Sequence, residues 1–333
     1  MWKRVVHWAQ PAIFVLACVL IVLLLASHWE ELRSYPWTLD GRWLLLSLAA
    51  LLASWAMEVG IWRDLLRLLG GWLSYGAAVR IWFLSAIVRY IPGNIWQPLS
   101  MTLYGQQYGI RPEATVMSIA LYQAVILLSA AVIAALYVLV TGNLGLLTPW
   151  LQAVLPALVL LMALPAAVFL LRPMWLIAIL NWALHKIGRR RLDAQLSSGR
   201  LFALLAVATL NWLLWGASFA ALTFALGAYS QDQALQLAPH LVVAYPIAYA
   251  AGFVSLITPS GFGVREGVFV ILLAPLMDPA VVAVAALAMR VVTLVGEFIL
   301  ALISAVWGRS AGTSAAVGAP QEAPTPMALP REG

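Results

Sequence analysis

Long uninterrupted runs of apolar residues constrain this chain more than any other feature. Two of them, Ile13 to Ala26 and Val154 to Leu171, contain no charged residue. In hydrocarbon, a helix satisfies all the backbone hydrogen bonds of such a run internally. Of the 333 residues, 64% are hydrophobic and 10% charged, whereas about 25% are charged in an ordinary soluble domain. This composition excludes soluble and disordered proteins. Because the alternating pattern of a membrane barrel is absent, we predict an all-α polytopic membrane protein.

Six segments have the length and composition of membrane-spanning helices. Each is apolar, is bounded by charges, glycine or proline, and is predicted to cross about 30 Å of hydrocarbon. The six predicted spans are Trp8–His28, Trp43–Gly60, Ala114–Val140, Trp150–Leu171, Leu201–Leu226 and Val281–Trp307. Glu58 falls at the end of the second span, where we expect it at the membrane interface.

Two further apolar regions, 72–109 and 240–277, are broken in the middle. The first break contains Pro92, Gly93 and Asn94, and the second runs from Pro259 to Gly263. Proline removes a backbone donor and glycine tolerates unusual dihedral angles, so each region is predicted to be helix, turn, helix. The helices after the breaks are only about 21 to 23 Å long at about 1.5 Å per residue. We therefore predict two re-entrant hairpins, with thin or tilted crossings as the alternative.

The two broken regions match each other in spacing. A proline follows 20 residues after Pro92 and again 20 residues after Pro259, and each of these second prolines, Pro112 and Pro279, stands where a long span begins. The same offset of 167 residues relates Gln123 to Arg290. We therefore predict an internal repeat, with a first half at 43–140 and a second half at 201–307.

The placement of the basic residues predicts the topology. An odd number of spans separates the two hairpins, which puts them on opposite faces and makes the repeat inverted. Most basic residues then fall on one side, including the cluster in a basic elbow at 172–200. The positive-inside rule makes that side cytoplasmic, together with both termini and a disordered tail at 308–333. The expected location is the cell inner membrane.

The second hairpin carries the side chain with the clearest expected function. Half-helices that end inside a membrane direct unpaired N–H groups toward the bilayer centre, which favours anionic ligands. Arg265 lies one residue into the helix after the second break, where an arginine costs about 2.5 to 3.5 kcal/mol on insertion scales. We predict that it contacts an anionic substrate group. The predicted substrate-binding residues are Arg89, Gly93, Asn94, Ser260, Gly261, Gly263, Arg265, Glu266, Arg290 and Glu297.

Structural alternatives stay open for the charged residues. Arg265 could form an ion pair with Glu266 or Glu297 that pins the hairpin. Arg290 and Glu297 lie seven residues apart and share a helix face, so they could pair with each other. Arg89 could extend to the cytoplasmic interface if its hairpin is shallow. Other polar side chains could line a hydrated cavity or join helices by hydrogen bonds: Gln97, Tyr104, Gln106, Gln107, Gln123 and Asn211.

Neither a catalytic site nor a cofactor site is predicted. The four histidines stand at distant span ends, Cys18 is the one cysteine, and the residues of the predicted spans offer no nucleophile with a base and an orienting group. The Gly261-Phe262-Gly263 run follows no strand and precedes no Walker lysine, which argues against a nucleotide loop. We expect no metal, no cofactor, no nucleic-acid partner and no enzymatic activity.

The residues at both breaks resemble the motifs of a known family. The stretch from Pro259 to Gly267 resembles the P-x-G-x-G-x-R-E motif of the flippase-like membrane region of lysylphosphatidylglycerol synthases, and the stretch from Arg89 to Asn94 is similar to that family's earlier hairpin motif. The resemblance spans roughly residues 5 to 307 and implies a role in moving a lipid between leaflets. Larger members add a cytoplasmic domain that makes aminoacylated phosphatidylglycerol. Here a short tail follows Trp307, so the resemblance implies a stand-alone membrane region without lysyl transfer.

The expected function is therefore that of an integral membrane lipid translocase. Its substrate would be an anionic or zwitterionic phospholipid, a glycolipid or a polyprenyl-linked lipid, with membrane lipids as its partners. One alternative is an ion-coupled transporter of a small anion. Another is a non-catalytic membrane partner of a lipid or glycan synthase, which would dock on the basic elbow. The oligomeric state is left open.

Overall fold

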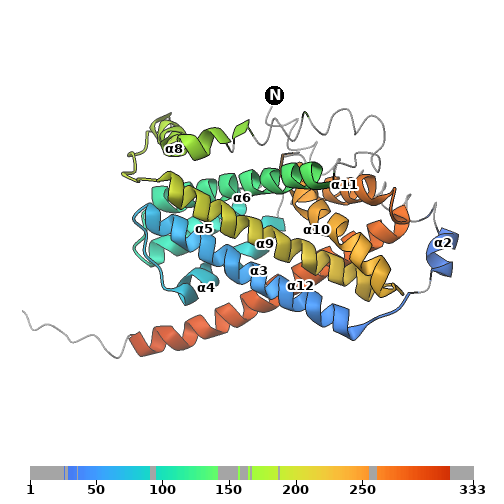
Figure 1. Ribbon diagram of the computed structural model, residues 1–333. Coiled ribbons are helices and arrows are strands. Elements are labelled where there is room, and N and C mark those ends of the chain that lie inside the picture. The colour runs from blue at the N-terminus through green and yellow to red at the C-terminus, as the bar shows by residue number, and fades with distance from the viewer. Residues whose placement is uncertain are drawn as a thin grey trace, which may run out of the picture.

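The computed structural model describes residues 29–35, 37–90, 95–141, 167–186, 188–254 and 261–315, with residues 26, 157, 164 and 165. All regular elements within these ranges are helices (Figure 1). Five of them are long and apolar enough to cross a membrane. These five are α3 (Gly41–Leu68), α6 (Pro112–Thr141), α9 (Ser198–Ala225), α10 (Gln231–Val254) and α12 (Pro279–Ala315). The prediction of an all-α polytopic membrane protein is confirmed.

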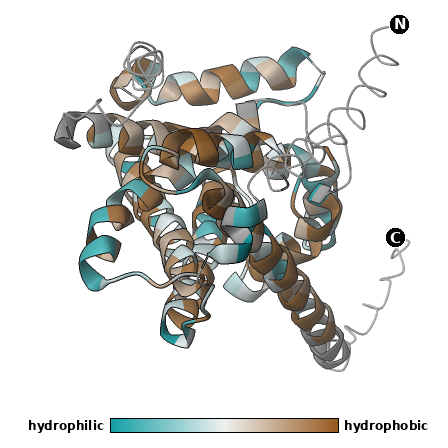
Figure 2. Cartoon of the chain, turned by 90° about the vertical axis from the view of Figure 1, so that its right-hand side faces the viewer, coloured by the Kyte–Doolittle hydropathy of each residue, from teal (hydrophilic) through white to brown (hydrophobic). Residues whose placement is uncertain are grey.

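The long helices expose apolar side chains, as lipid contact requires. Along α12, Val291, Leu294, Val295, Phe298 and Leu302 are each between 45% and 61% exposed, and their spacing of three and four residues places them on one stripe of the helix. Hydrophobic colour dominates the long helices in Figure 2, and hydrophilic colour is concentrated at helix ends and connections. The chain is thus a multi-pass membrane protein whose outer surface faces lipid.

Four predicted spans correspond to α3, α6, α9 and α12, and two of these helices, α3 and α12, extend well past their predicted ends. α3 continues to Leu68, past the expected end at Gly60. α12 ends at Ala315, so the first residues of the predicted tail at 308–333 are helical. The other two predicted spans, Trp8–His28 and Trp150–Leu171, lie mostly outside the described residues, as do residues 316–333.

The first broken region has the short arms that a hairpin requires. α4 (Tyr75–Ala86) runs into a 3-10 helix, η1 (Ile87–Tyr90), and α5 (Trp96–Gln107) follows the break. α5 has 12 residues, or about 18 Å at 1.5 Å per residue, so it cannot cross the hydrocarbon upright. The Ser85 hydroxyl donates to the Ser100 hydroxyl at 3.0 Å, which joins the two arms.

The second broken region differs from its prediction at its first arm. α10 has 24 residues and is itself a candidate span, so the predicted hairpin at 240–277 begins inside a longer helix. A reciprocal cap explains the early start: the Gln233 N–H donates to the Ser230 hydroxyl, and the Ser230 N–H donates to the Gln233 side chain. This capping box allows α10 to begin at polar residues. The prediction excluded these residues from the apolar region because their hydropathy is low. The second arm, α11 (Val264–Leu273), has only 10 residues.

The two halves of the described fold have the same order of helices and the same pattern of contacts. α3, α4, α5 and α6 correspond to α9, α10, α11 and α12. α4 packs on α12 as α10 packs on α6, and α5 contacts α6 as α11 contacts α12. Pro112 and Pro279 begin α6 and α12, as the spacing predicts.

The first helices of the two halves are antiparallel. The start of α3 meets the end of α9, where the Asp40 N–H donates to the Ala225 carbonyl at 3.0 Å and the Ser47 hydroxyl donates to the Ser218 carbonyl at 2.8 Å. An inverted repeat requires this antiparallel arrangement of equivalent helices. The inverted relation of the complete halves stays a prediction.

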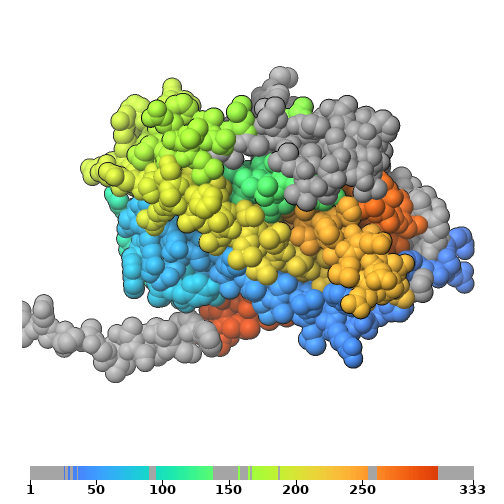
Figure 3. Space-filling view, in the orientation of Figure 1, coloured from blue at the N-terminus to red at the C-terminus, as the bar shows by residue number. Residues whose placement is uncertain are grey.

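A short helix, α8 (Met174–Lys186), lies beside α6 on the outside of the bundle of long helices (Figure 3). The part of the basic elbow that follows α8 folds back on this helix, because the Asn181 side chain accepts from the Leu192 N–H at 2.9 Å and donates to the Leu192 carbonyl at 3.1 Å. Met174, Trp175 and Trp182 are exposed, with Trp182 at 62%. These apolar side chains and the adjacent arginines suit a helix at the membrane interface.

The close approach of α9 and α10 depends on Gly216. A Cβ atom at this position would lie 2.3 Å from the Val242 carbonyl oxygen. We predict that Gly216→Ala destabilises the protein by about 1 to 3 kcal/mol, because backbone atoms must move apart. The measurement is thermal unfolding of the purified protein in detergent. Gly60→Ala is the matched control, since nothing lies within 4 Å of its added Cβ and alanine favours a helix. Equal unfolding temperatures for the two variants would contradict the prediction.

Candidate functional site

A cavity of about 130 Å³ lies between the two broken regions and the long helices. Its wall includes five of the predicted site residues: Arg89, Arg265, Glu266, Arg290 and Glu297. Two of the predicted cavity-lining amides, Gln97 and Gln123, also belong to the wall. These five charged residues, which lie up to 208 positions apart in the sequence, therefore meet in one polar chamber, which has room for several water molecules.

Glycines shape the entrance to α11. Gly261 and Gly263 have φ angles of +68° and +82°, a region that residues with a Cβ rarely adopt. A Cβ at Gly261 would also lie 2.9 Å from the Cα of Gly252, at the end of α10. Gly261 and Gly263, predicted as substrate-binding residues, thus fix the backbone that presents Arg265 and Glu266.

Glu266 connects the start of α11 to α12. One of its oxygens accepts from the Gly263 N–H at 2.6 Å, and the other lies 2.5 Å from Nη1 of Arg290. The Arg290 guanidinium also lies over the Phe262 ring, 4.7 Å from its centroid. Glu266 is buried and Arg290 is only 16% exposed, so removal of one partner would leave the other charge poorly compensated.

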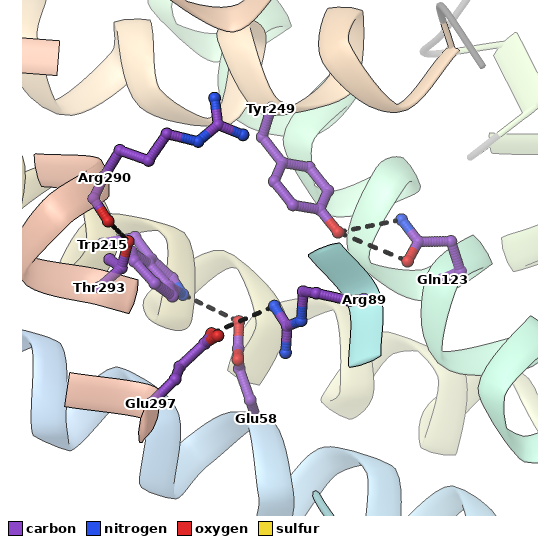
Figure 4. A network of polar contacts seen from close by, with 8 residues as sticks. All are labelled: Glu58, Arg89, Gln123, Trp215, Tyr249, Arg290, Thr293 and Glu297. Atoms are coloured by element: carbon purple, nitrogen blue, oxygen red, sulfur yellow. Dashed lines mark hydrogen bonds and ion pairs between the residues drawn. The ribbon is translucent and has the colours of Figure 1, made fainter. Parts of the chain in front are cut away.

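Arg89 connects η1 to the same long helix. Its Nη1 lies 3.2 Å from an oxygen of Glu297, whose side chain is only 5% exposed (Figure 4). The alternative in which Arg89 extends to the cytoplasmic interface is therefore wrong. Arg290 and Glu297, seven residues apart on α12, each bind a residue of a different broken region.

Arg265 has a different environment from the other two arginines. Its guanidinium carbon lies 5.1 Å from the ring centroid of Tyr245 and 5.6 Å from that of Tyr249, in the range of cation–π contacts. Its aliphatic stem packs where a side chain at Gly252 would stand, 2.6 Å from the position of a Cβ. Across the described ranges no carboxylate lies within ion-pair distance of Arg265. The alternative in which Arg265 pairs with Glu266 or Glu297 is not what the structure shows.

Glu58 is a cavity residue that the sequence analysis placed wrongly. It lines the chamber, and one carboxylate oxygen accepts from Nε1 of Trp215 at 2.8 Å (Figure 4). The expectation of an interfacial position followed from ending the predicted span at Gly60. Because α3 continues to Leu68, Glu58 stands nearly three turns before the end of the helix. The charged residues Arg63, Asp64 and Arg67 mark the true end of this helix.

The remaining predicted residues divide into three groups. Gly93, Asn94 and Ser260 lie outside the described residues. Gln106 and Gln107 are exposed, and Asn211 is buried in α9 and is not part of the cavity wall. Tyr104 is absent from the cavity wall. In the portion of the chain that the structure describes, no three His, Cys, Asp or Glu side chains come together to hold a metal ion.

The charges of the chamber define what it can bind. Three arginines and three glutamates line it, and two of each are joined in the pairs Arg290–Glu266 and Arg89–Glu297. Among the described residues, no carboxylate lies within ion-pair distance of the third arginine, Arg265. Arginine offers up to five donors to a phosphate or carboxylate group, and the start of α11 adds a favourable helix dipole. The chamber is suited to one small anionic group.

A double-mutant cycle tests the Arg290–Glu266 pair. Glu266→Gln keeps an acceptor for the Gly263 N–H but leaves Arg290 without its anion, and we expect a loss of about 3 to 5 kcal/mol of stability. The double variant Glu266→Gln with Arg290→Gln should regain most of that loss, because two neutral side chains replace the pair. Thermal unfolding in detergent measures both effects. Asp64→Asn, which breaks the more exposed Arg67–Asp64 contact at 3.6 Å, should cost less than about 1 kcal/mol. Additive losses at positions 266 and 290 would refute the coupling.

Comparison with known proteins agrees with the resemblance seen in the sequence motifs. No curated protein matches the chain. Residues 9–301 match the protein family described as the lysylphosphatidylglycerol synthase TM region. The match covers every described element from α2 (Trp29–Ser34) to α11 and most of α12. The chain belongs to the family of the lysylphosphatidylglycerol synthase TM region.

Proposed function

We propose that this protein moves a lipid with an anionic or zwitterionic head group between the two leaflets of the membrane. The head group would pass through the polar chamber while the acyl chains stay in the bilayer. Candidate substrates are phospholipids, glycolipids and polyprenyl-linked lipids, and the chain itself would carry out no head-group chemistry. Arg265 carries the proposal, because it is the chamber arginine without a carboxylate partner among the described residues.

The three arginines of the chamber differ in their partners, and this difference supports the proposed role. Arg89 and Arg290 each hold a buried glutamate, so their charge is already compensated. Arg265 lies over the rings of Tyr245 and Tyr249, which are neutral partners, and an arginine inside the membrane is costly unless an anion accompanies it. A phosphate group at Arg265 would supply that anion.

Two further observations favour a lipid as the substrate. The family membership points to a lipid-related role in the membrane. The chamber is lined by six charged side chains, which suits a polar head group and is unfavourable for acyl chains. The same charged lining also favours a second candidate function, the ion-coupled transport of a small soluble anion.

Leaflet exchange of fluorescent phosphatidylglycerol in proteoliposomes tests the proposal. We expect the unmodified chain to accelerate exchange and Arg265→Ala to reduce it about tenfold or more, because a charge-assisted hydrogen bond contributes about 1.5 to 3 kcal/mol. Arg265→Lys keeps the positive charge but loses the planar set of N–H donors of the guanidinium group, so an intermediate exchange rate is expected. Arg200→Ala, an exposed arginine at the start of α9, is the matched control and should exchange lipid normally.

The outcomes separate the candidate functions. Equal rates for Arg265→Ala and Arg200→Ala, at matched folding and reconstitution, would remove Arg265 from the site. An unmodified chain that exchanges no lipid but transports phosphate would favour the small-anion candidate. Inactivity in both assays would favour a third role, that of a membrane partner for a lipid or glycan synthase.

We also propose an inner-membrane location with both termini and the basic elbow on the cytoplasmic side. In a Cys18→Ser background, Arg190→Cys should react with a membrane-impermeant thiol reagent only in inside-out vesicles. Gln231→Cys, at the start of α10, should react only in right-side-out vesicles, since α9 separates the two positions. Labelling of both cysteines from the same side would overturn this topology.

A further inference from the structure

Of the three glutamates that line the chamber among the described residues, Glu58 belongs to neither ion pair. Glu266 and Glu297 are held by Arg290 and Arg89. Within the described ranges, no arginine or lysine lies within ion-pair distance of Glu58. A neutral donor, the indole N–H of Trp215, donates a hydrogen bond to Glu58 at 2.8 Å. Glu58 is thus a carboxylate inside the membrane with access to the chamber and without a counter-ion at contact distance.

Polar and titratable groups face Glu58 from every side of the chamber. Arg89 lies on η1 and Glu297 on α12, and both interact with Glu58 electrostatically. The other polar groups around Glu58 are neutral: Tyr122 on α6, Asn211 and Trp215 on α9, and Tyr245 and Tyr249 on α10. One arginine and one glutamate therefore act on Glu58 from a distance, and they already neutralise each other.

We propose that Glu58 is a proton-binding site that couples proton uptake to the binding of the anionic head group at Arg265. This inference rests on the proposed function and adds the identity of a coupling ion. The proton comes from water in the chamber and adds to a carboxylate oxygen of Glu58. No other bond forms or breaks. Trp215 can donate to the carbonyl oxygen in both protonation states, so the local packing does not have to change.

Glu58 suits this role better than the other two glutamates. A proton on Glu266 or Glu297 would remove the carboxylate charge that Arg290 or Arg89 pairs with, which is strongly unfavourable. A proton on Glu58 breaks no ion pair. Among the three, Glu58 is therefore the carboxylate that can change its charge while both contacts of α12 to the broken regions persist.

The charge balance gives the sign of the coupling. With all three glutamates ionised, the six charged side chains of the chamber sum to zero. Protonation of Glu58 makes the sum +1, and a singly charged anion at Arg265 brings it back to zero. Each ligand should therefore strengthen the binding of the other by the same factor. Anion affinity is expected to be higher at low pH and to fall as the pH rises.

Binding of short-chain phosphatidylglycerol to the purified full chain in detergent tests this inference. The phosphodiester stays singly charged between about pH 5 and about pH 9, so a change in affinity reports the protein. We expect the unmodified chain to lose affinity about fivefold or more as the pH rises, since couplings of this kind span about 5- to 150-fold. We also expect proton uptake when the lipid is added in weak buffer with a pH indicator.

Two glutamine substitutions make a matched pair. Glu58→Gln keeps the acceptor for Trp215 but cannot gain a proton, so its affinity should be independent of pH and lipid addition should take up no proton. Glu113→Gln removes the same charge from the exposed Arg189–Glu113 pair and should behave like the unmodified chain. If Glu58→Gln does not fold, Glu58→Asp should still bind lipid with a shifted pH dependence.

The outcomes separate this inference from the proposed function. Binding and leaflet exchange that are independent of pH, or proton uptake that persists in Glu58→Gln, would overturn the role of Glu58 and leave lipid transport standing. An affinity that follows sodium concentration and not pH would likewise refute a proton site. Failure of the unmodified chain to bind or exchange any lipid would overturn both proposals together.

Discussion

The described structure depends on the need to compensate charged side chains inside the membrane. α12 carries one cation and one anion, Arg290 and Glu297, and each is matched by a residue from a different broken region. A buried charge without a partner would cost several kcal/mol, so these two pairs fix the position of η1 and of the start of α11 against a single helix. The polar chamber is the space that this arrangement encloses.

The charged residues of the site could be predicted from the sequence, because charged residues are rare within apolar segments. Arg89, Arg265, Glu266, Arg290 and Glu297 were all predicted, and all line the chamber. Their pairing was not predictable. Arg265 and Glu266 are neighbours in the chain, but consecutive residues on a helix point about 100° apart, so one contacts the tyrosines of α10 and the other binds α12.

The predictions for Glu58 and for the start of α10 were wrong for the same reason, because both placed helix ends where the hydropathy changes. Glu58 was placed at an interface because the apolar run stops near Gly60, whereas α3 continues through charged residues to Leu68. α10 was begun too late because its first turns are polar and its cap is a local hydrogen-bond pattern at Ser230. Tyr245 and Tyr249 gave no signal in the sequence, since aromatic residues at helical spacing are usually packing residues. Tertiary contacts decide their role.

The burial of the two α12 ion pairs also determines how they respond to ionic strength. Dissolved salt screens exposed charges over a Debye length of about 8 Å at physiological concentration, but it screens buried pairs much less. Arg67 and Asp64, with side chains 35% and 57% exposed, belong to the first class, and Arg290 and Glu266, at 16% and 6%, to the second. Added salt should therefore weaken the Arg290–Glu266 pair much less than the Arg67–Asp64 pair. A charge that enters the chamber itself competes with the Arg290–Glu266 pair directly.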